Sequence, residues 1–119
     1  MARVLTQAQA RNLGLPGRRS LEIVSGETGS RAVTLRLVEI PVPKSGEAPR
    51  GRHFHADTEE CIYVMSGAGC TESESGNHPL KAGDTLLIPP GEPHVTRNTG
   101  SEPLVLLCFF PIARVTNRS

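Results

Sequence analysis

The sequence predicts a single all-β domain, and three observations support this fold class. At 119 residues, the chain has the length of one ordinary domain. Its 12 Gly and 10 Pro residues divide it into many short segments, while an apolar fraction of 37% suffices for one core. Short apolar segments recur at the spacing of roughly 8–12 residues that is typical of β-sandwiches and barrels, and helical periodicity is nearly absent.

Each predicted element is bounded by turn-forming residues. Residues 4–13 are expected to form a short helix or a loose strand, which ends at Gly14. Residues 21–25 and 32–40 flank Gly-Glu-Thr-Gly-Ser, a favourable hairpin loop because glycine adopts positive φ at no steric cost. A connection rich in proline and glycine follows. The other predicted strands are residues 52–56, 60–66, 70–75, 84–88, 94–98 and 104–110, of which we expect the last to be buried on both faces.

Composition argues against nucleic acid and membranes as partners. The net charge is +1, the pI is about 7.8 and the basic residues are scattered, whereas nucleic-acid-binding domains gather them on one face. The longest apolar run, residues 104–110, is far shorter than the roughly 20 residues of a membrane-spanning helix. Three cysteines cannot form a disulfide framework, and the N-terminal residues lack a signal-peptide core. We therefore expect a cytoplasmic protein with free thiols.

Three of the four histidines are placed where strand geometry can bring them together. His53 and His55 are two residues apart, so on a strand both rings point to the same face. Four residues separate them from Glu60, and a tight antiparallel turn there would put this carboxylate beside the rings. His94 follows the rigid turn Pro89-Pro-Gly-Glu-Pro. Three imidazoles and one carboxylate are a donor set suited to Mn, Fe, Co, Ni or Zn.

Other reactive side chains are expected to have ordinary roles. Alternation along residues 60–66 places Glu59 and Tyr63 on the face opposite Glu60, where Tyr63 would serve core or interface packing. His78 is expected to be a solvated turn residue. The three cysteines are expected to behave as small buried hydrophobes: Cys61, Cys70 and Cys108. For the histidine set, the alternative is a scaffold that binds no metal.

Four arginines are the best placed to meet an acidic substrate. They are Arg36, Arg50, Arg52 and Arg97. Arg52 precedes His53 directly and Arg97 lies three residues after His94, and an odd separation along a strand puts each arginine on the face opposite the histidine. We expect each of the four to be a solvated or interface residue.

The spacing of the histidines and Glu60 resembles the first motif of the cupin superfamily. That motif is matched here by His53-x-His55, four residues, Glu60, six residues and Gly67. The chain departs from it once, because six residues instead of five separate Gly46 from His53. The family spacing also favours Glu60 over its neighbour as the carboxylate ligand.

The second cupin motif is matched at every fixed position. It runs through Gly83, five residues, Pro89-x-Gly91, two residues, His94, three residues and Asn98. Fifteen residues lie between the two motifs, the short spacing of compact microbial members. The chain is thus identified as a small, single-domain member of the bacterial type.

The resemblance implies a double-stranded β-helix, or jelly-roll barrel. We expect residues 19–113 to form the cupin barrel, residues 1–18 an N-terminal arm or short strand or helix, and residues 114–119 a C-terminal tail. Small cupins commonly form homodimers, often by exchanging an N-terminal strand. The residues before Gly14 could serve in this way.

The resemblance also implies one divalent transition metal per chain, held by His53, His55, Glu60 and His94. Fe or Mn is expected, with Ni, Co and Zn as alternatives. Four protein ligands leave about two positions of an octahedral ion open for a small-molecule substrate.

A metalloenzyme acting on a small oxygenated organic compound is the expected function. Oxygenase-type chemistry is favoured because the metal and the substrate carry out most of the reaction, so that few further protein side chains are needed. A non-redox isomerase, decarboxylase or lyase of a hydroxy acid, keto acid or sugar is the first alternative. An isomerase in particular needs a positioned acid or base, for which the sequence offers only His78, Glu39, Tyr63 and Cys108. A small-molecule binding module without turnover is the second alternative.

Overall fold

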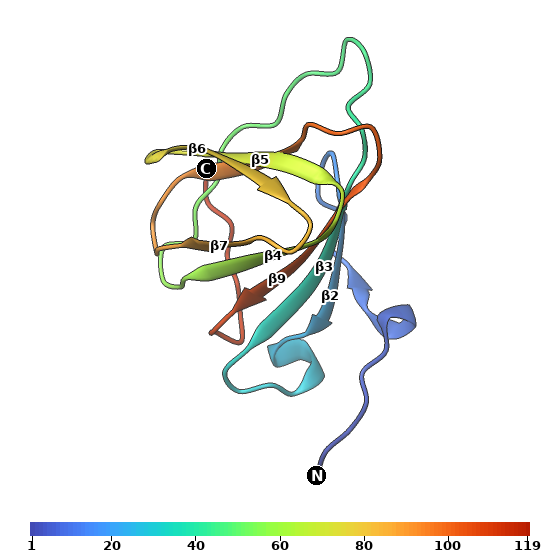
Figure 1. The fold of residues 1–119 in the computed structure, drawn as a ribbon. Helices are drawn as coiled ribbons and strands as arrows, with labels where there is room; N and C mark the ends of the chain where they lie inside the picture. Colours follow the sequence, from blue (N-terminus) through green and yellow to red (C-terminus); the bar gives the residue numbers. More distant parts are fainter.

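The fold consists of two antiparallel sheets, two short 3₁₀ turns and no α-helix (Figure 1). A computed structural model describes residues 1–119. The 3₁₀ turns are η1 (Gln7–Gln9) and η2 (Gly26–Thr28). The strands are β1 (Arg11–Asn12), β2 (Arg19–Val24), β3 (Thr34–Ile40), β4 (Glu60–Ser66), β5 (Ala68–Ser73), β6 (Gly76–Lys81), β7 (Thr85–Ile88), β8 (His94–Asn98) and β9 (Leu104–Phe110). The predicted all-β fold is confirmed.

Strand order mixes distant parts of the chain, as in a jelly roll. The larger sheet has the order β1-β2-β3-β9-β4-β7, and the smaller has the order β6-β5-β8. Strand β9 lies between β3 and β4, and its pairing with β3 runs without interruption from Thr34↔Phe110 to Ile40↔Leu104. In Figure 1 the smaller sheet lies over one part of the larger sheet, and the chain passes back and forth between them.

Burial alternates along the strands, so each sheet has an inner and an outer face. On β9, Leu104, Leu106, Cys108 and Phe110 are buried, whereas Phe109 is 37% exposed. The expectation that this strand is buried on both faces was therefore wrong, because only the smaller sheet covers one side of it. The core between the sheets consists of ten residues: Val38, Ile40, Ile62, Val64, Leu80, Ile88, Leu104, Leu106, Cys108 and Phe110.

Two predicted elements differ in the structure. His78, expected to be a solvated turn residue, instead occupies a half-buried position on β6, which pairs with β5 along its whole length. Residues 52–56, expected to be a strand, form only isolated bridges, His53↔His94 and Phe54↔Arg118. Sequence alternation describes a strand well but does not reveal whether a neighbouring strand is available along its whole length.

Residues 4–13, expected to form a short helix or a loose strand, contain one short element of each kind. These are the 3₁₀ turn η1 and the two-residue strand β1 on the edge of the larger sheet. Figure 1 shows the chain before η1 extending away from the sheets. None of the helical turns is long and apolar enough to cross a membrane. The division into arm, barrel and tail stays a prediction.

A buried ion pair connects β2 to β3 inside the larger sheet. The Arg36 guanidinium binds the Glu22 carboxylate through Nε at 3.1 Å and Nη2 at 3.0 Å, and it also lies over the Phe110 ring. Arg11 binds the other carboxylate oxygen at 2.9 Å. Burial alone would raise the pKa of Glu22, but hydrogen bonds from Ser25 and the arginines, with the charge of Arg36, lower this pKa below its ordinary value.

Removing Arg36 is expected to destabilise the fold strongly. Arg36→Met leaves the buried Glu22 carboxylate with the exposed Arg11 as its one ion-pair partner. This change should lower the free energy of unfolding by about 3 kcal/mol. A double variant with Glu22→Leu should recover most of that loss, since it removes the buried charge. Because the folded pKa of Glu22 is depressed, its contribution is present above about pH 4.3 and is lost as the pH falls further. Urea unfolding of the three proteins between pH 3 and 7 measures these differences.

Candidate metal centre

The four side chains of the predicted ligand set come from three separate segments. His94 begins β8, Glu60 begins β4, and His53 and His55 lie on the segment before β4. That segment is clamped against β8 and its preceding turn, because His53 and His94 exchange backbone hydrogen bonds at 2.8 and 2.9 Å. Gly91 N–H donates to the His55 carbonyl at 2.7 Å. The histidine segment thus pairs with β8, and the expected tight hairpin with residues 60–66 was wrong.

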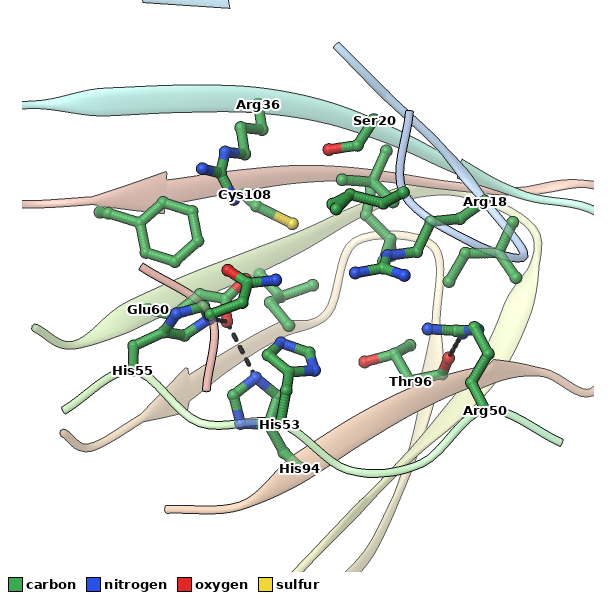
Figure 2. A pocket seen from close by; sticks show the side chains of 17 residues that line it. Arg18, Ser20, Arg36, Arg50, His53, His55, Glu60, His94, Thr96 and Cys108 are labelled. Atoms are coloured by element: carbon green, nitrogen blue, oxygen red, sulfur yellow. Dashed lines mark hydrogen bonds and ion pairs between the residues drawn. The ribbon is translucent and has the colours of Figure 1, made fainter. Parts of the chain in front are cut away.

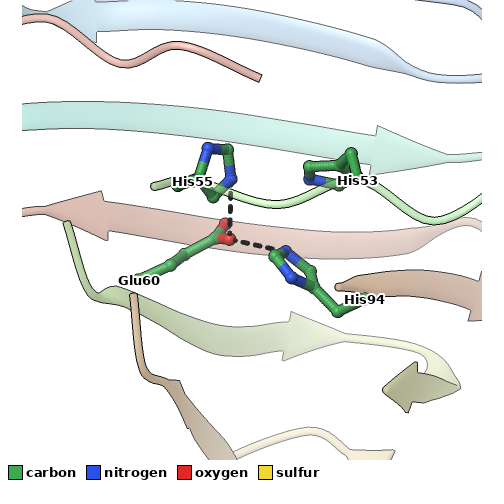
Figure 3. Close-up of side chains that lie close together, drawn as sticks. All are labelled: His53, His55, Glu60 and His94. Atoms are coloured by element: carbon green, nitrogen blue, oxygen red, sulfur yellow. Dashed lines mark hydrogen bonds and ion pairs between the residues drawn. The ribbon is translucent and has the colours of Figure 1, made fainter. Parts of the chain in front are cut away.

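The predicted ligand atoms converge between the sheets (Figure 3). One nitrogen of each ring and one Glu60 oxygen all lie within 4.8 Å of one another. Glu60 Oε1 is 3.1 Å from His94 Nε2 and 3.4 Å from His55 Nε2. Glu60, His55 and His94 are buried, and Glu59 is exposed, as strand alternation predicted. This compact set of three nitrogens and one oxygen could hold a metal ion.

Backbone carbonyls orient two of the rings. His55 Nδ1 donates to the Thr116 carbonyl at 3.0 Å, and His94 Nδ1 donates to the Glu92 carbonyl at 2.8 Å. With the proton on Nδ1, the Nε2 atom of each ring points at the Glu60 carboxylate. A nitrogen lone pair that faces a carboxylate oxygen repels it unless a proton or a metal cation lies between them. His55 Nε2 is moreover a buried atom without a hydrogen-bond partner, which the donor set of a metal site explains.

The electrostatics of the cluster favour cation binding. Burial lowers the pKa of His53 to about 3, and the neighbouring rings of His94 and His55 add to this effect, so the ring is neutral. Burial by itself raises the pKa of Glu60, but the adjacent rings of His55 and His94 outweigh it and lower this pKa to about 2. At neutral pH the cluster therefore offers a neutral imidazole lone pair and a full negative charge, which is the protonation state that metal ligation requires.

A pocket that opens onto the cluster is lined by three arginines (Figure 2). It holds about 470 Å³ of space between protein atoms, part of it open to solvent, and its wall includes Arg18, Arg36 and Arg50. Arg36 is neutralised by Glu22, but Arg18 and Arg50 form none of the ion pairs of the structure. Arg50 instead donates to the Thr96 carbonyl.

The two unpaired arginines are close enough for the charge of Arg18 to lower the pKa of Arg50. Burial lowers the pKa of Arg50 to about 10, with further lowering by the charges of Arg18 and Arg97, and burial together with Arg36 lowers the pKa of Arg18. Both guanidinium groups remain charged at neutral pH. Since like charges gathered in a half-buried pocket repel one another, an anion placed among them would be stabilised.

A protein-family comparison decides the identity of the fold. The family model described as "Cupin domain" matches residues 38–110, which is more than half of the chain. The chain belongs to the cupin family. The match includes all four residues of the candidate metal centre and leaves Arg18 and the residues after Phe110 outside.

Several curated proteins are similar to this cupin over part of their length. An uncharacterized protein from Methanocaldococcus jannaschii is 39% identical over 78 residues, which cover 66% of this chain and 61% of that protein. Glucose-6-phosphate isomerase from Thermococcus gammatolerans is 36% identical over 66 residues, covering 50% and 35%. The oxalate-binding protein from Thermotoga maritima is 35% identical over 60 residues, covering half of each. The matches thus span from about a third to three fifths of these relatives.

Solved structures agree on the fold. A variant of oxalate decarboxylase from Bacillus subtilis superimposes with a TM-score of 0.80 and 22% identity, covering 95% of this chain and 30% of that one. At this identity the likeness establishes the jelly-roll fold alone. The predicted cupin barrel is confirmed.

The arginines of this cupin are placed differently from the prediction. Arg36, expected to be solvated or at an interface, is buried in an ion pair, because β3 lies in the interior of the larger sheet. Arg52 is exposed, as expected, and Arg97 pairs with Glu72 at 2.7 Å on the smaller sheet. Arg18 was not among the candidates. It precedes β2 in sequence, and only the folded sheet brings it to the pocket.

The predicted acid–base candidates lie mostly outside the pocket. Glu39 pairs with Arg19, Tyr63 is on the outer face of β4, and His78 hydrogen bonds to Ser73 and Ser75. Cys108 does line the pocket, but burial, with the nearby Glu60 charge, raises its pKa well above the ordinary value of a thiol. The pocket of this cupin therefore provides no protein base other than the candidate metal ligands.

Proposed function

We propose that this cupin is a metal-dependent enzyme that acts on a small organic acid. The observation that carries the proposal is the presence of two unpaired arginines, Arg18 and Arg50, in the pocket that opens onto the His53–His55–Glu60–His94 cluster. A cationic wall beside a chelating site suits a carboxylate with a second oxygen donor, such as a hydroxy acid, a keto acid or a dicarboxylate.

The four clustered residues would hold one divalent ion, and Mn or Fe is proposed. When bound, such an ion supplies Lewis acidity toward the oxygen atoms of the substrate. The chain's own contributions are different. Arg18 and Arg50 would bind and orient the acid, while Ile62, Leu106 and Phe110 keep water away from one side of the pocket. Burial of the cluster strengthens each of these electrostatic contacts.

Decarboxylation is the reaction that we propose. The bond between the carboxylate carbon and its neighbour breaks, CO₂ leaves, and the electron pair remains on the neighbouring carbon, which then takes a proton from water. No protein base is needed to start this reaction, in contrast to the isomerisation of a sugar. The similarity to an oxalate-binding protein supports a small acid as the ligand.

Oxygenase chemistry is the second candidate, because an octahedral ion held by the four clustered residues would keep about two positions for a substrate and dioxygen. One experiment separates the two reactions. The chain is loaded with Mn(II) or Fe(II) and incubated with oxalate, 2-oxo acids and 2-hydroxy acids, while CO₂ and dissolved O₂ are measured. CO₂ release without O₂ uptake is expected. O₂ uptake would favour the second candidate, and binding without turnover would contradict an enzymatic role.

A homodimer is also proposed, with the outer face of the larger sheet as its interface. Leu35, Phe109, Cys61 and Leu87 form one row across β3, β9, β4 and β7, and Tyr63 and Met65 lie beside it. Leu87 is 58% exposed and Met65 50%, and contiguous apolar surface of this kind marks a contact site. A second copy fits because a flat sheet face can pair with itself about a two-fold axis.

Leu87→Glu is expected to convert this dimer into a monomer, since a charge would be buried in the centre of the contact. Light scattering coupled to size-exclusion chromatography measures the mass of both proteins. Arg52→Glu, an exposed change elsewhere on the chain, serves as the control. A wild-type chain that stays monomeric at high concentration would contradict the proposed dimer.

A further inference from the structure

The C-terminal residues cross the molecule in contact with the candidate metal centre. After β9 the chain turns back, and in Figure 1 the red segment runs away from the end of that strand toward the opposite side of the sheets. It is anchored at its start, where Thr34 Oγ1 donates to the Ile112 carbonyl at 2.7 Å and Gly26 N–H donates to the Ala113 carbonyl at 2.8 Å. Ile112 and Val115 pack against the core.

The next residues reach the histidine segment. Phe54 and Arg118 exchange backbone hydrogen bonds, with Phe54 N–H donating at 2.7 Å and Arg118 N–H at 2.9 Å. Thr116 and Asn117 lie between this contact and the residues that pack against the core, Ile112 and Val115. The Thr116 carbonyl accepts a hydrogen bond from His55 Nδ1, and Asn117 lines the pocket. The segment is therefore attached on both sides of the His55 contact.

This arrangement explains why the His55 ring points Nε2 at the cluster. The ring is bonded to the protein only through Nδ1, because its Nε2 has no hydrogen-bond partner. His94 is oriented by Glu92, two residues away in sequence, but His55 depends on a carbonyl 61 residues away. The orienting carbonyl also lies outside residues 38–110, the part of the chain that matches the cupin family.

We propose that residues 112–118 form a strap that completes the metal site, with Thr116 as a positioning residue that holds the His55 ring through its carbonyl and Asn117 as part of the pocket wall. The metal-binding part of this proposal rests on the proposed function. The strap makes the site of this chain dependent on a segment beyond the family domain. Loss of an orienting partner of a ligand histidine typically weakens metal binding about 10–100-fold.

Two matched pairs of variants test the strap. Arg118→Pro removes the N–H that donates to Phe54, whereas Arg118→Ala keeps it. Deletion of residues 116–119 removes the orienting carbonyl but retains Val115 and the core anchor, whereas Thr116→Ala keeps the carbonyl. Co(II) titration followed by visible absorption gives the affinity and the ligand geometry. Thermal unfolding of the metal-free proteins shows whether each variant is folded.

The deletion and Arg118→Pro are expected to bind Co(II) about 10–100-fold more weakly and with an altered spectrum, and the two alanine variants are expected to match the wild type. Equal affinity and an unchanged spectrum in the deletion variant would overturn the strap. Nitrogen-15 NMR of the histidine rings in the metal-free chain at pH 8 tests it without any metal. A His55 ring protonated at Nδ1 in the wild type and in mixed tautomers in the deletion supports the strap, and identical tautomers contradict it. Failure of the wild type to bind Co(II) would instead overturn the proposed metal function.

Discussion

Replacing His55 or Glu60 with alanine is expected to weaken the binding of Mn(II) or Co(II) by more than about 100-fold, since the loss of an orienting partner alone costs about 10–100-fold. The Glu60 carboxylate supplies the only negative charge in the cluster, and His55 Nε2 is directed at the same point. Either substitution leaves three of the four donor atoms, and the Glu60 variant also removes the negative charge that attracts the cation. Calorimetric titration of the metal-free proteins measures the affinities.

The chain offers matched controls for this experiment. Glu59→Ala removes the adjacent but exposed carboxylate, and His78→Ala removes the one histidine outside the cluster. Both should bind metal as the wild type does. If the Glu60 and His55 variants kept stoichiometric metal at unchanged affinity, the ligand assignment would be wrong.

Replacing Arg18 or Arg50 with alanine is expected to weaken the binding of an organic acid by about 10–150-fold each, because a hydrogen bond to a charged group contributes roughly 1.5–3 kcal/mol. Metal binding should not be weakened, since removal of a nearby positive charge can only favour a bound cation. Oxalate titration of the Mn(II)-loaded proteins measures the first effect, and metal titration measures the second. Arg50→Lys should retain part of the affinity for oxalate, because lysine keeps the positive charge but lacks the planar guanidinium.

Arg52→Ala is the matched control, since this exposed arginine lies next to a candidate ligand in sequence but does not line the pocket. It should bind oxalate as tightly as the wild type. Equal losses in all three arginine variants would indicate a general effect of net charge. Such a result would remove the basis for an acidic substrate.

The convergence of the four candidate ligands could be predicted because both local spacing and the resemblance to the cupin motifs apply to them directly. The two-residue spacing of His53 and His55 puts their rings on one side, alternation separates Glu60 from Glu59, and the proline turn delivers His94. The partner of the histidine segment could not be predicted in the same way. Pairing with β8 rather than β4 depends on long-range strand order, which periodicity does not encode.

Residues that act across the fold were missed for the same reason. Arg18 precedes the first long strand and Thr116 follows the last, so no motif connects them with the histidines. Thr116 acts through its carbonyl, and a backbone group carries no signal in the residue type. Arg36 was misjudged because charge predicts exposure, whereas its burial is stabilised by Glu22 from the neighbouring strand.

Anomalous diffraction from crystals of the metal-loaded chain is the decisive test of the four proposed metal ligands. One strong peak is expected between the two sheets, about 2.0–2.2 Å from a nitrogen of each of the rings of His53, His55 and His94 and from a Glu60 oxygen. A peak at any other place, or metal-loaded crystals in which these four side chains do not surround the ion, would contradict the proposed metal centre.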